Sequence, residues 1–309
     1  MSATLAPAPG PSPVARTGRE EILPWSWAST VAMLLVTVVG VASFTWPFFV
    51  DSDAALARGN DSPWLFPVLV GLLGAVLVAQ VSRGGLDAKA VATLGVLAAL
   101  GGALRVLSAG TAGLEPMFFL LVVGGRVLGR AGGFLLGALA ILTGAFLTGG
   151  VGPWLPYQIL AAGWVGLGAA LLPRVPARVE RYLLAAYGLV AGLGYGAVMN
   201  LWFWPFLGAS APSGAGFDPA DPLTTQLAHY AVFYGLTSLG WDLPRGVLTA
   251  ALVLVAAPAV LRALRRAVRR AQFGARPEFG PPVSPESDGV RPVTVSGERS
   301  DREPGDSHL

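Results

Sequence analysis

The sequence predicts an all-α membrane protein in which several helices cross the bilayer. Hydrophobic residues make up 53% of the 309 residues, whereas charged residues make up only 13%. Most of the apolar residues are gathered into runs of about 18 residues or more, the length that an α-helix needs to cross a hydrocarbon core of about 30 Å. Charged residues, mostly arginine, lie between these runs. A soluble domain does not have this composition, and we expect a polytopic protein with about eight membrane-spanning helices.

The N-terminal part is predicted to hold a polar segment and two spans. Residues 1–26 are rich in Ala, Pro and Gly, and we expect them to be disordered. Residues 27–85 form a two-span extension with apolar runs at 27–50 and 64–81. The first run is too long for a cleaved signal peptide and lacks a small-residue cleavage site.

Residues 86–271 are predicted to form a core of six further spans. The expected spans are 86–107, 116–128, 131–148, 155–172, 182–203 and 240–261. The segment 223–239 is only moderately apolar, and we interpret it as an outer-surface or partly inserted helix. Residues 272–309 are rich in Pro, Ser and charge, which predicts a disordered cytoplasmic tail.

The arginines predict the orientation of the chain, because basic residues gather in cytoplasmic loops. With the N-terminus inside and eight crossings, the outer loops receive Arg58 alone, plus Arg105 at a helix end. A ninth crossing would place the terminal arginine cluster outside. We therefore expect both termini to be cytoplasmic. The basic residues on the inner side would be Arg83, Lys89, Arg126, Arg130, Arg174, Arg178, Arg181 and the five arginines of 262–270.

The sequence holds no recognisable catalytic or metal-binding motif. It has no cysteine and two histidines, and it contains no P-loop, HExxH or GxSxG pattern. His229 has no second ligand at helical spacing, so we interpret it as an interfacial hydrogen-bonding residue. We predict a protein that is not an enzyme and has no cofactor, with a membrane enzyme of unfamiliar type as the weaker alternative. Membrane orientation explains the basic residues, which argues against a nucleic-acid partner.

Polar and aromatic residues gather at the predicted outer ends of the spans. Polar groups at membrane depth are costly unless they pair or line a cavity. An interfacial aromatic belt would also place Trp and Tyr there, but a symmetric belt does not predict their bias to the outer side. Asp242 and Arg245 share one helical face, as an ion pair or as a grip for a ligand. The candidate ligand-binding residues are Arg105, Glu115, Trp154, Tyr157, Gln158, Asn200, Trp202, Trp204, Tyr234, Trp241, Asp242 and Arg245.

The span 86–107 carries a stripe of small residues. Gly95, Ala99 and Ala103 recur at every fourth position, so they share one helical face. In lipid, such a stripe lets another helix backbone approach closely. Our hypothesis is that the stripe docks a separate membrane subunit. The alternative is that it packs against another span of the same chain.

Four parts of the core carry a family resemblance. They are the helix with Ala99 and Ala103, and the stretches that read LEPMFFLLVVGGRVLGRAGGFLLGAL, PWLPYQILAAGWVGLGAALLP and LGWDLPRGVLTAALVL. Over roughly residues 86–266 the chain resembles the substrate-binding S component of energy-coupling factor (ECF) transporters, a type of ABC importer. The resemblance implies a bacterial cytoplasmic-membrane protein that takes up a vitamin. It also implies a membrane coupling subunit, which docks on Gly95, Ala99 and Ala103, and two ATPase subunits.

The ligand is less closely specified than the class of protein. An outer pocket rich in Trp and Tyr suits a large, partly planar and partly polar molecule, and we favour a cobalamin-type ligand over a flavin. A self-sufficient secondary transporter is the main alternative, although the sequence shows neither an inverted repeat nor a pair of broken midplane helices. A non-catalytic membrane scaffold is the third possibility.

Overall fold

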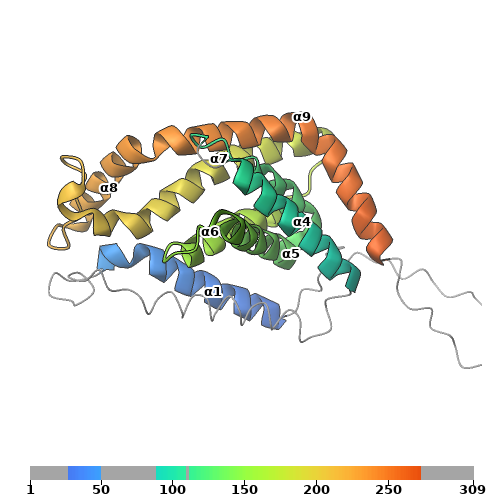
Figure 1. The fold of residues 1–309 in the computed structure, drawn as a ribbon, viewed down its shortest axis with the longest axis horizontal. Coiled ribbons are helices and arrows are strands. Elements are labelled where there is room, and N and C mark those ends of the chain that lie inside the picture. Colours follow the sequence, from blue (N-terminus) through green and yellow to red (C-terminus); the bar gives the residue numbers. More distant parts are fainter. Residues whose placement is uncertain (1–26, 50–87, 109–110, 273–309) are drawn as a thin grey trace, which may run out of the picture. The chain divides into compact units, whose positions relative to one another are not determined.

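The computed structural model describes residues 27–49, 88–108 and 111–272 (Figure 1). Every regular element in these ranges is a helix, and no strand occurs among them. The predicted span 64–81, the N-terminal segment 1–26 and nearly all of the tail 272–309 lie outside the described residues.

The elements follow the order of the predicted spans. They are α1 (Trp27–Thr45), η1 (Trp46–Phe49), α4 (Ala88–Leu107), α5 (Met117–Thr148), α6 (Leu155–Leu171), α7 (Ala177–Phe203), η2 (Trp204–Ser210), α8 (Leu223–Thr237) and α9 (Leu239–Gln272). Among the described residues, 5 helices are long and apolar enough to cross a membrane, and α6 is a shorter apolar helix. The prediction of an all-α polytopic membrane protein is confirmed. The number of crossings and the location of the termini stay predictions.

Helix α5 turns back on itself at Gly129, whose φ of 83° and ψ of −174° lie outside the helical region. Glycine tolerates this positive φ because it has no side chain. A Cβ added at Gly133 would lie 2.9 Å from the Cα atom of Gly125. In a straight helix these two residues would be about 12 Å apart. The two halves of α5 therefore pack side by side, and the reversal falls between the predicted spans 116–128 and 131–148.

Close backbone contact joins the α5 hairpin to α6. Cβ atoms added at Gly125 and Gly133 would lie 2.2 Å and 2.5 Å from the carbonyl oxygen of Gly166. A Cβ at Gly137 would lie 2.1 Å from the carbonyl oxygen of Ala162. Only glycine fits at such distances. Small residues at the contact are the means by which helices pack in lipid, where the hydrophobic effect does not drive association.

A second glycine stripe joins α7 to α9, which run side by side in Figure 1. Gly188, Gly192 and Gly196 recur at every fourth position, and each lies against α9. A Cβ at Gly192 would lie 2.7 Å from the Cα atom of Gly246. This stripe has the same spacing as Gly95, Ala99 and Ala103 but was not among the predicted contacts.

Helix α4 has one packed face and one free face. Gly101 and Gly102 pack against α5, where added Cβ atoms would lie 2.6 Å from Ala140 and 2.7 Å from Thr143. The stripe of Gly95, Ala99 and Ala103 is exposed instead, and a Cβ at Gly95 would meet no atom within 4 Å. The described part of the chain therefore does not cover this stripe.

Helix α1 packs onto the core through its C-terminal half. Phe44 is only 1% exposed, and its ring centroid lies 5.1 Å from that of Tyr157 and 5.7 Å from that of Trp164. Gly40 also faces Trp164, because a Cβ added there would lie 2.7 Å from the indole ring. The described part of the N-terminal extension therefore packs as part of the helical bundle.

Ion pairs close the end of the bundle that we predict to face the cytoplasm. Glu180 at the start of α7 pairs with Arg126 of α5 at 2.9 Å and with Arg265 of α9 at 2.7 Å. Arg126 also donates hydrogen bonds to the carbonyl oxygens of Leu172 and Pro173, at 2.7 Å and 3.0 Å. One carboxylate therefore ties three helices and the α6–α7 connection together.

Candidate ligand-binding site

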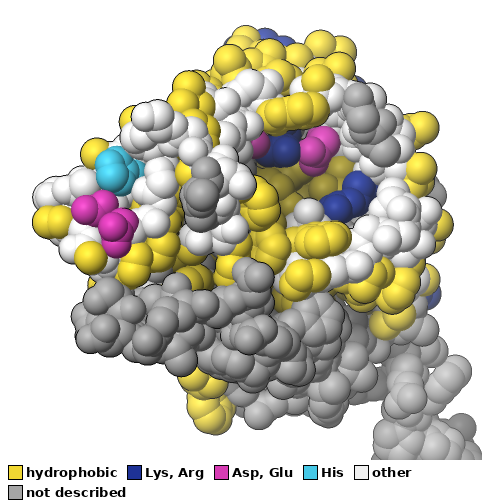
Figure 2. All heavy atoms as spheres, turned by 60° about the vertical axis from the view of Figure 1, so that its left-hand side comes forward, with side chains coloured by type: hydrophobic (Ala, Val, Ile, Leu, Met, Phe, Trp, Pro, Cys, Tyr) yellow, Lys and Arg dark blue, Asp and Glu magenta, His cyan; other side chains and the backbone are white. Residues whose placement is uncertain are grey.

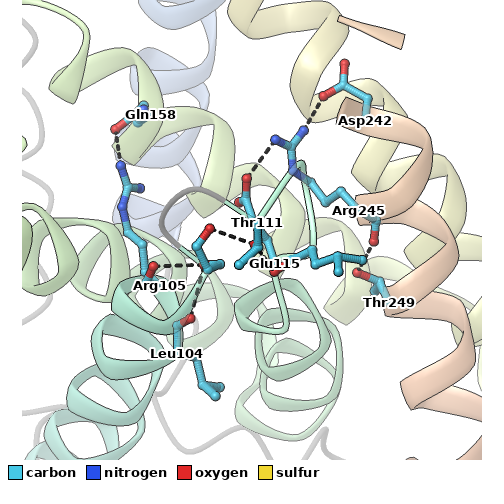
Figure 3. Close-up of polar contacts among 10 residues, drawn as sticks. Leu104, Arg105, Thr111, Glu115, Gln158, Asp242, Arg245 and Thr249 are labelled. Carbon is cyan, nitrogen blue, oxygen red and sulfur yellow. Dashed lines mark hydrogen bonds and ion pairs between the residues drawn. The ribbon is translucent and has the colours of Figure 1, made fainter. Parts of the chain in front are cut away.

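Five of the predicted site residues meet at the opposite end of the bundle, from four different elements (Figure 3). They are Arg105 of α4, Glu115 of the loop before α5, Gln158 of α6, and Asp242 and Arg245 of α9. The structure forms two groups from them, which lie on opposite sides of the close-up.

The loop before α5 brings Glu115 to α9. Gly113 in this loop has a φ of 86°, and a Cβ added there would lie 2.0 Å from the carbonyl oxygen of Trp241. Glycine is required for both reasons, because an L side chain would be strained and would collide with the α9 backbone. This contact places Glu115 next to Arg245, although 130 residues separate them in sequence.

The first group, which we call the acidic wall, consists of Glu115, Arg245 and Asp242. The Arg245 guanidinium donates a hydrogen bond to Oε1 of Glu115 at 2.8 Å and forms a close ion pair with Oδ1 of Asp242. It also lies 5.3 Å and 5.2 Å from the ring centroids of Phe118 and Tyr195, within range of cation–π attraction. One guanidinium is shared by two carboxylates, so the acidic wall is net negative.

The members of the acidic wall differ in their access to solvent. The side chains of Asp242 and Arg245 are 3% and 9% exposed, whereas that of Glu115 is 25% exposed. Oδ2 of Asp242 and Nε of Arg245 are buried without a hydrogen-bond partner among the described residues. Asp242 and Arg245 are therefore enclosed by protein. Glu115 is the member of the acidic wall that solvent or a ligand can reach.

The second group, which we call the basic wall, consists of Arg105 and Gln158. The Arg105 guanidinium donates a hydrogen bond to Oε1 of Gln158 at 2.8 Å. Within the described ranges no carboxylate pairs with Arg105, unlike Arg126, Arg245 and Arg265. The basic wall is therefore net positive.

A hollow with a hydrophobic floor opens on this face of the molecule (Figure 2). Basic and acidic side chains gather together on one side of it, and a further basic side chain lies on another side. The buried Tyr195 of α7 lies beside the acidic wall, because its ring centroid is 5.2 Å from the guanidinium carbon of Arg245. Its ring also packs against Phe118, with a centroid distance of 4.8 Å.

An aromatic pair follows the basic wall along α6 and α7. Tyr157, which is next to Gln158 in sequence, is 2% exposed and lies 5.4 Å from the ring of Trp202. Trp202 is half-buried, and its ring centroid also lies 6.1 Å from that of Phe206. Of these two predicted residues, Trp202 is the one with surface left for a ligand.

The structure leaves Trp204 no surface that a ligand could contact. Its side chain is 0% exposed, and its indole Nε1 donates a hydrogen bond to the carbonyl oxygen of Ala215 at 2.7 Å. The rings of Phe217 and Tyr230 pack around it at 5.1 Å and 5.2 Å. Trp204 thus holds the loop between η2 and α8 against α8, in a small hydrophobic cluster of its own.

Two further predicted tryptophans are exposed. Trp154 lies at the start of α6, where its indole Nε1 donates to the carbonyl oxygen of Gly150 at 3.3 Å. Trp241 lies in the first turn of α9, with about half of its side chain exposed. Neither side chain makes a polar contact with Arg105, Glu115 or the other wall residues within the described ranges.

Asn200 and Tyr234 hold the helices around the hollow. The Asn200 amide donates to the hydroxyl of Ser238, which lies between α8 and α9. The Tyr234 hydroxyl donates to the carbonyl oxygen of Leu193 in α7 at 3.3 Å. Burial raises the pKa of Tyr234 to about 12, so this phenol stays protonated and keeps its hydrogen bond near neutral pH.

Sequence reasoning did not connect any glycine with the two walls. A Cβ at Gly144 would lie 2.4 Å from Cδ of Arg105, and one at Gly196 would lie 1.7 Å from Oδ2 of Asp242. Gly196 could have been found from its place in the stripe with Gly188 and Gly192. The spacing of the glycines in 131–148 marks Gly144 as a packing residue, but only the fold shows that its neighbour is Arg105.

These features define a polytopic helical membrane protein with a polar hollow between helix ends. The described residues contain no group of three or more His, Asp or Glu side chains that could hold a metal ion. No protein-family model matches the sequence, and neither a curated protein nor a solved structure gives a match.

Proposed function

We propose that the chain is the substrate-binding membrane subunit of an ECF-type ABC importer in a bacterial cytoplasmic membrane, and that it binds a vitamin or related micronutrient. One observation carries the proposal: the hollow combines a hydrophobic floor with two polar walls at the predicted outer end of the bundle. A partly planar, partly polar solute could bury its apolar part on the floor and form hydrogen bonds at the walls.

The exposed stripe of α4 supports a membrane partner. Gly95, Ala99 and Ala103 are exposed, while the opposite face of the same helix packs on α5. A small-residue face lets a second helix approach closely in lipid. A membrane coupling subunit is the proposed occupant. Two separate ATPase subunits would supply the energy, since the chain has no P-loop of its own.

The aromatic pair supports a ligand with a planar part. Trp202 keeps exposed surface beside the buried ring of Tyr157, so a flat ring system could stack on it. The proposed ligand is a cobalamin-type molecule, followed by a flavin. The sequence resemblance supports this order, and both molecules combine a conjugated ring system with polar side groups.

The test begins with the full-length chain expressed in a bacterium and purified in detergent. Mass spectrometry of molecules released on denaturation should find a vitamin, and cyanocobalamin or riboflavin should rebind with sub-micromolar affinity. Uptake into cells should require a coupling subunit and ATPases. Uptake by the chain alone would favour a secondary transporter, and failure to bind any vitamin would favour a scaffold.

A further inference from the structure

The two walls of the hollow carry opposite charge, and we infer from this that the site takes a ligand that is neutral overall. The ligand would direct a hydrogen-bond acceptor to Arg105 and a donor to Glu115. This inference rests on the proposed function, because it concerns the same hollow. It adds the charge class of the ligand and the residue on each side that recognises it.

The charges of the described site residues balance across the hollow. Arg105 has a neutral partner, Gln158, so the basic wall keeps one positive charge. Arg245 is shared by Glu115 and Asp242, so the acidic wall keeps one negative charge. The site is therefore neutral as a whole but polarised.

Burial decides which member of the acidic wall meets the ligand. Asp242 and Arg245 are nearly inaccessible, while a quarter of the Glu115 side chain is exposed. Only Oε1 of Glu115 bonds to Arg245 within the described residues, which leaves Oε2 for a ligand donor. Asp242 and Arg245 act as positioning residues that hold Glu115 in place.

Filling the hollow removes water from Arg105 and Glu115. An ionised group that loses its water without a polar partner is costly, so the ligand must supply an acceptor for Arg105 and a donor for Glu115. An anionic group near Arg105 would be attracted by the guanidinium but repelled by Glu115, and this repulsion is strong where the surroundings have a low dielectric constant. A neutral ligand with amide or hydroxyl groups satisfies both walls without adding unbalanced charge.

The test uses two pairs of probes whose members differ in charge, the first pair at nearly constant shape. The first pair is cyanocobalamin and a monocarboxylic acid made from it by hydrolysis of one side-chain amide. The second pair is riboflavin and riboflavin phosphate. Affinity is measured by equilibrium binding to the purified full-length chain. In the pair that binds, the neutral member should bind more tightly by about tenfold or more, which corresponds to about 1.4 kcal/mol.

Two substitutions should change this preference in opposite directions. Glu115→Gln removes the repelling charge and should reduce the difference in affinity between the neutral and the anionic probe. Arg105→Gln removes the attracting charge and should increase this difference in affinity. Arg178→Gln is the matched control, because it removes one positive charge from an exposed position at the start of α7, near Glu180 and the other end of the bundle. The control should leave the preference unchanged.

The outcomes separate the inference from the proposed function. If cyanocobalamin or riboflavin binds but its anionic counterpart binds equally well or better, the inference is wrong and the proposed function stands. Equal losses for both members of a pair in Arg105→Gln and Glu115→Gln would also overturn the inference, because purely structural roles give that result. If none of the four compounds binds, both the proposed ligand class and the inference fail.

Discussion

Gly196 of α7 lies directly against the carboxylate of Asp242 on α9, so closely that an added Cβ would be 1.7 Å from Oδ2. Asp242 in turn pairs with Arg245, which holds Glu115 at the edge of the hollow. The absence of a side chain at Gly196 thus leaves the space that the Asp242 carboxylate occupies. The contact joins the packing of two helices to the position of the proposed ligand-binding group.

We predict that Gly196→Ala displaces Asp242 and lowers the melting temperature. Overpacking a tight contact costs about 1–3 kcal/mol, and disturbing the ion pair adds to this loss. Gly194→Ala is the control on the same helix, since a Cβ there meets no atom within 4 Å. It should be neutral or slightly stabilising, because Ala favours a helix more than Gly. Equal melting temperatures for the two variants would argue against the contact.

The two faces of α4 should respond differently to added bulk. Ala99→Trp enlarges the exposed stripe, so it should leave melting and ligand binding unchanged but abolish copurification with the coupling subunit and uptake. Gly101→Val enlarges the packed face, where an added Cβ would lie 2.6 Å from Ala140, and should lower the melting temperature. The docking role of the stripe would have to be abandoned if Ala99→Trp lowered melting and binding together.

Truncation to alanine should distinguish the role of Trp202 from that of Trp204. Trp204 is fully buried and hydrogen-bonded to Ala215, so Trp204→Ala should cost about 3–5 kcal/mol of stability. Trp202 is half-buried beside Tyr157, and Trp202→Ala should weaken the binding of cyanocobalamin or riboflavin by about 1–3 kcal/mol. Thermal unfolding and equilibrium binding measure the two effects. An unstable Trp202→Ala with undiminished affinity would favour a belt role for that residue.

The ion pairs at the predicted cytoplasmic end should matter mainly for stability. Glu180→Ala leaves Arg126 without its carboxylate partner, and breaking a buried pair in this way costs about 3–5 kcal/mol. Arg265→Ala should cost much less, because the Arg265 side chain is 37% exposed and water can replace the pair. Melting temperatures of the two variants check this order, and the reverse order would show that Glu180 depends mainly on Arg265.

The orientation in the membrane can be tested with single cysteines, since the chain has none of its own. Ser213→Cys, in the exposed loop between η2 and α8, should react with an impermeant thiol reagent added to intact cells. Ala177→Cys, at the exposed start of α7, should react only after the cells are opened. Ser213 is preferable to its neighbour Gly214, whose φ of 74° would strain a cysteine. Labelling of Ala177→Cys from outside would invert the predicted topology.

The apolar runs and the arginines between them were sufficient to predict the class of fold. Hydrophobic length alone decides whether a helix can cross a membrane, so the runs that became α1, α4, α7 and α9 were evident. The reversal at Gly129 was partly visible, because Arg126 and Arg130 mark a polar interruption there. The ion pair between Glu115 and Arg245 was not predictable, since nothing local indicates that residues so far apart in the chain meet.

For the candidate site, the sequence could predict which end of the bundle holds it. Interfacial depth is a property of the sequence, so the outward set included Arg105, Glu115, Gln158, Asp242 and Arg245. Burial is a property of packing, and the same reasoning could not separate Trp202 from the fully buried Trp204. The small residues that shape the walls have no chemistry of their own, and only the three-dimensional contacts show their role.

The reversal at Gly129 also affects the depth at which the proposed site would lie in the membrane. The first half of α5 runs from Met117 to the turn, and a helix of that length measures only about 18 Å, against about 30 Å for the hydrocarbon core. Glu115 stands just above this half-helix. If the turn at Gly129 lies at the inner surface, as Arg126 and Arg130 predict, a molecule held beside Glu115 would already lie within the bilayer.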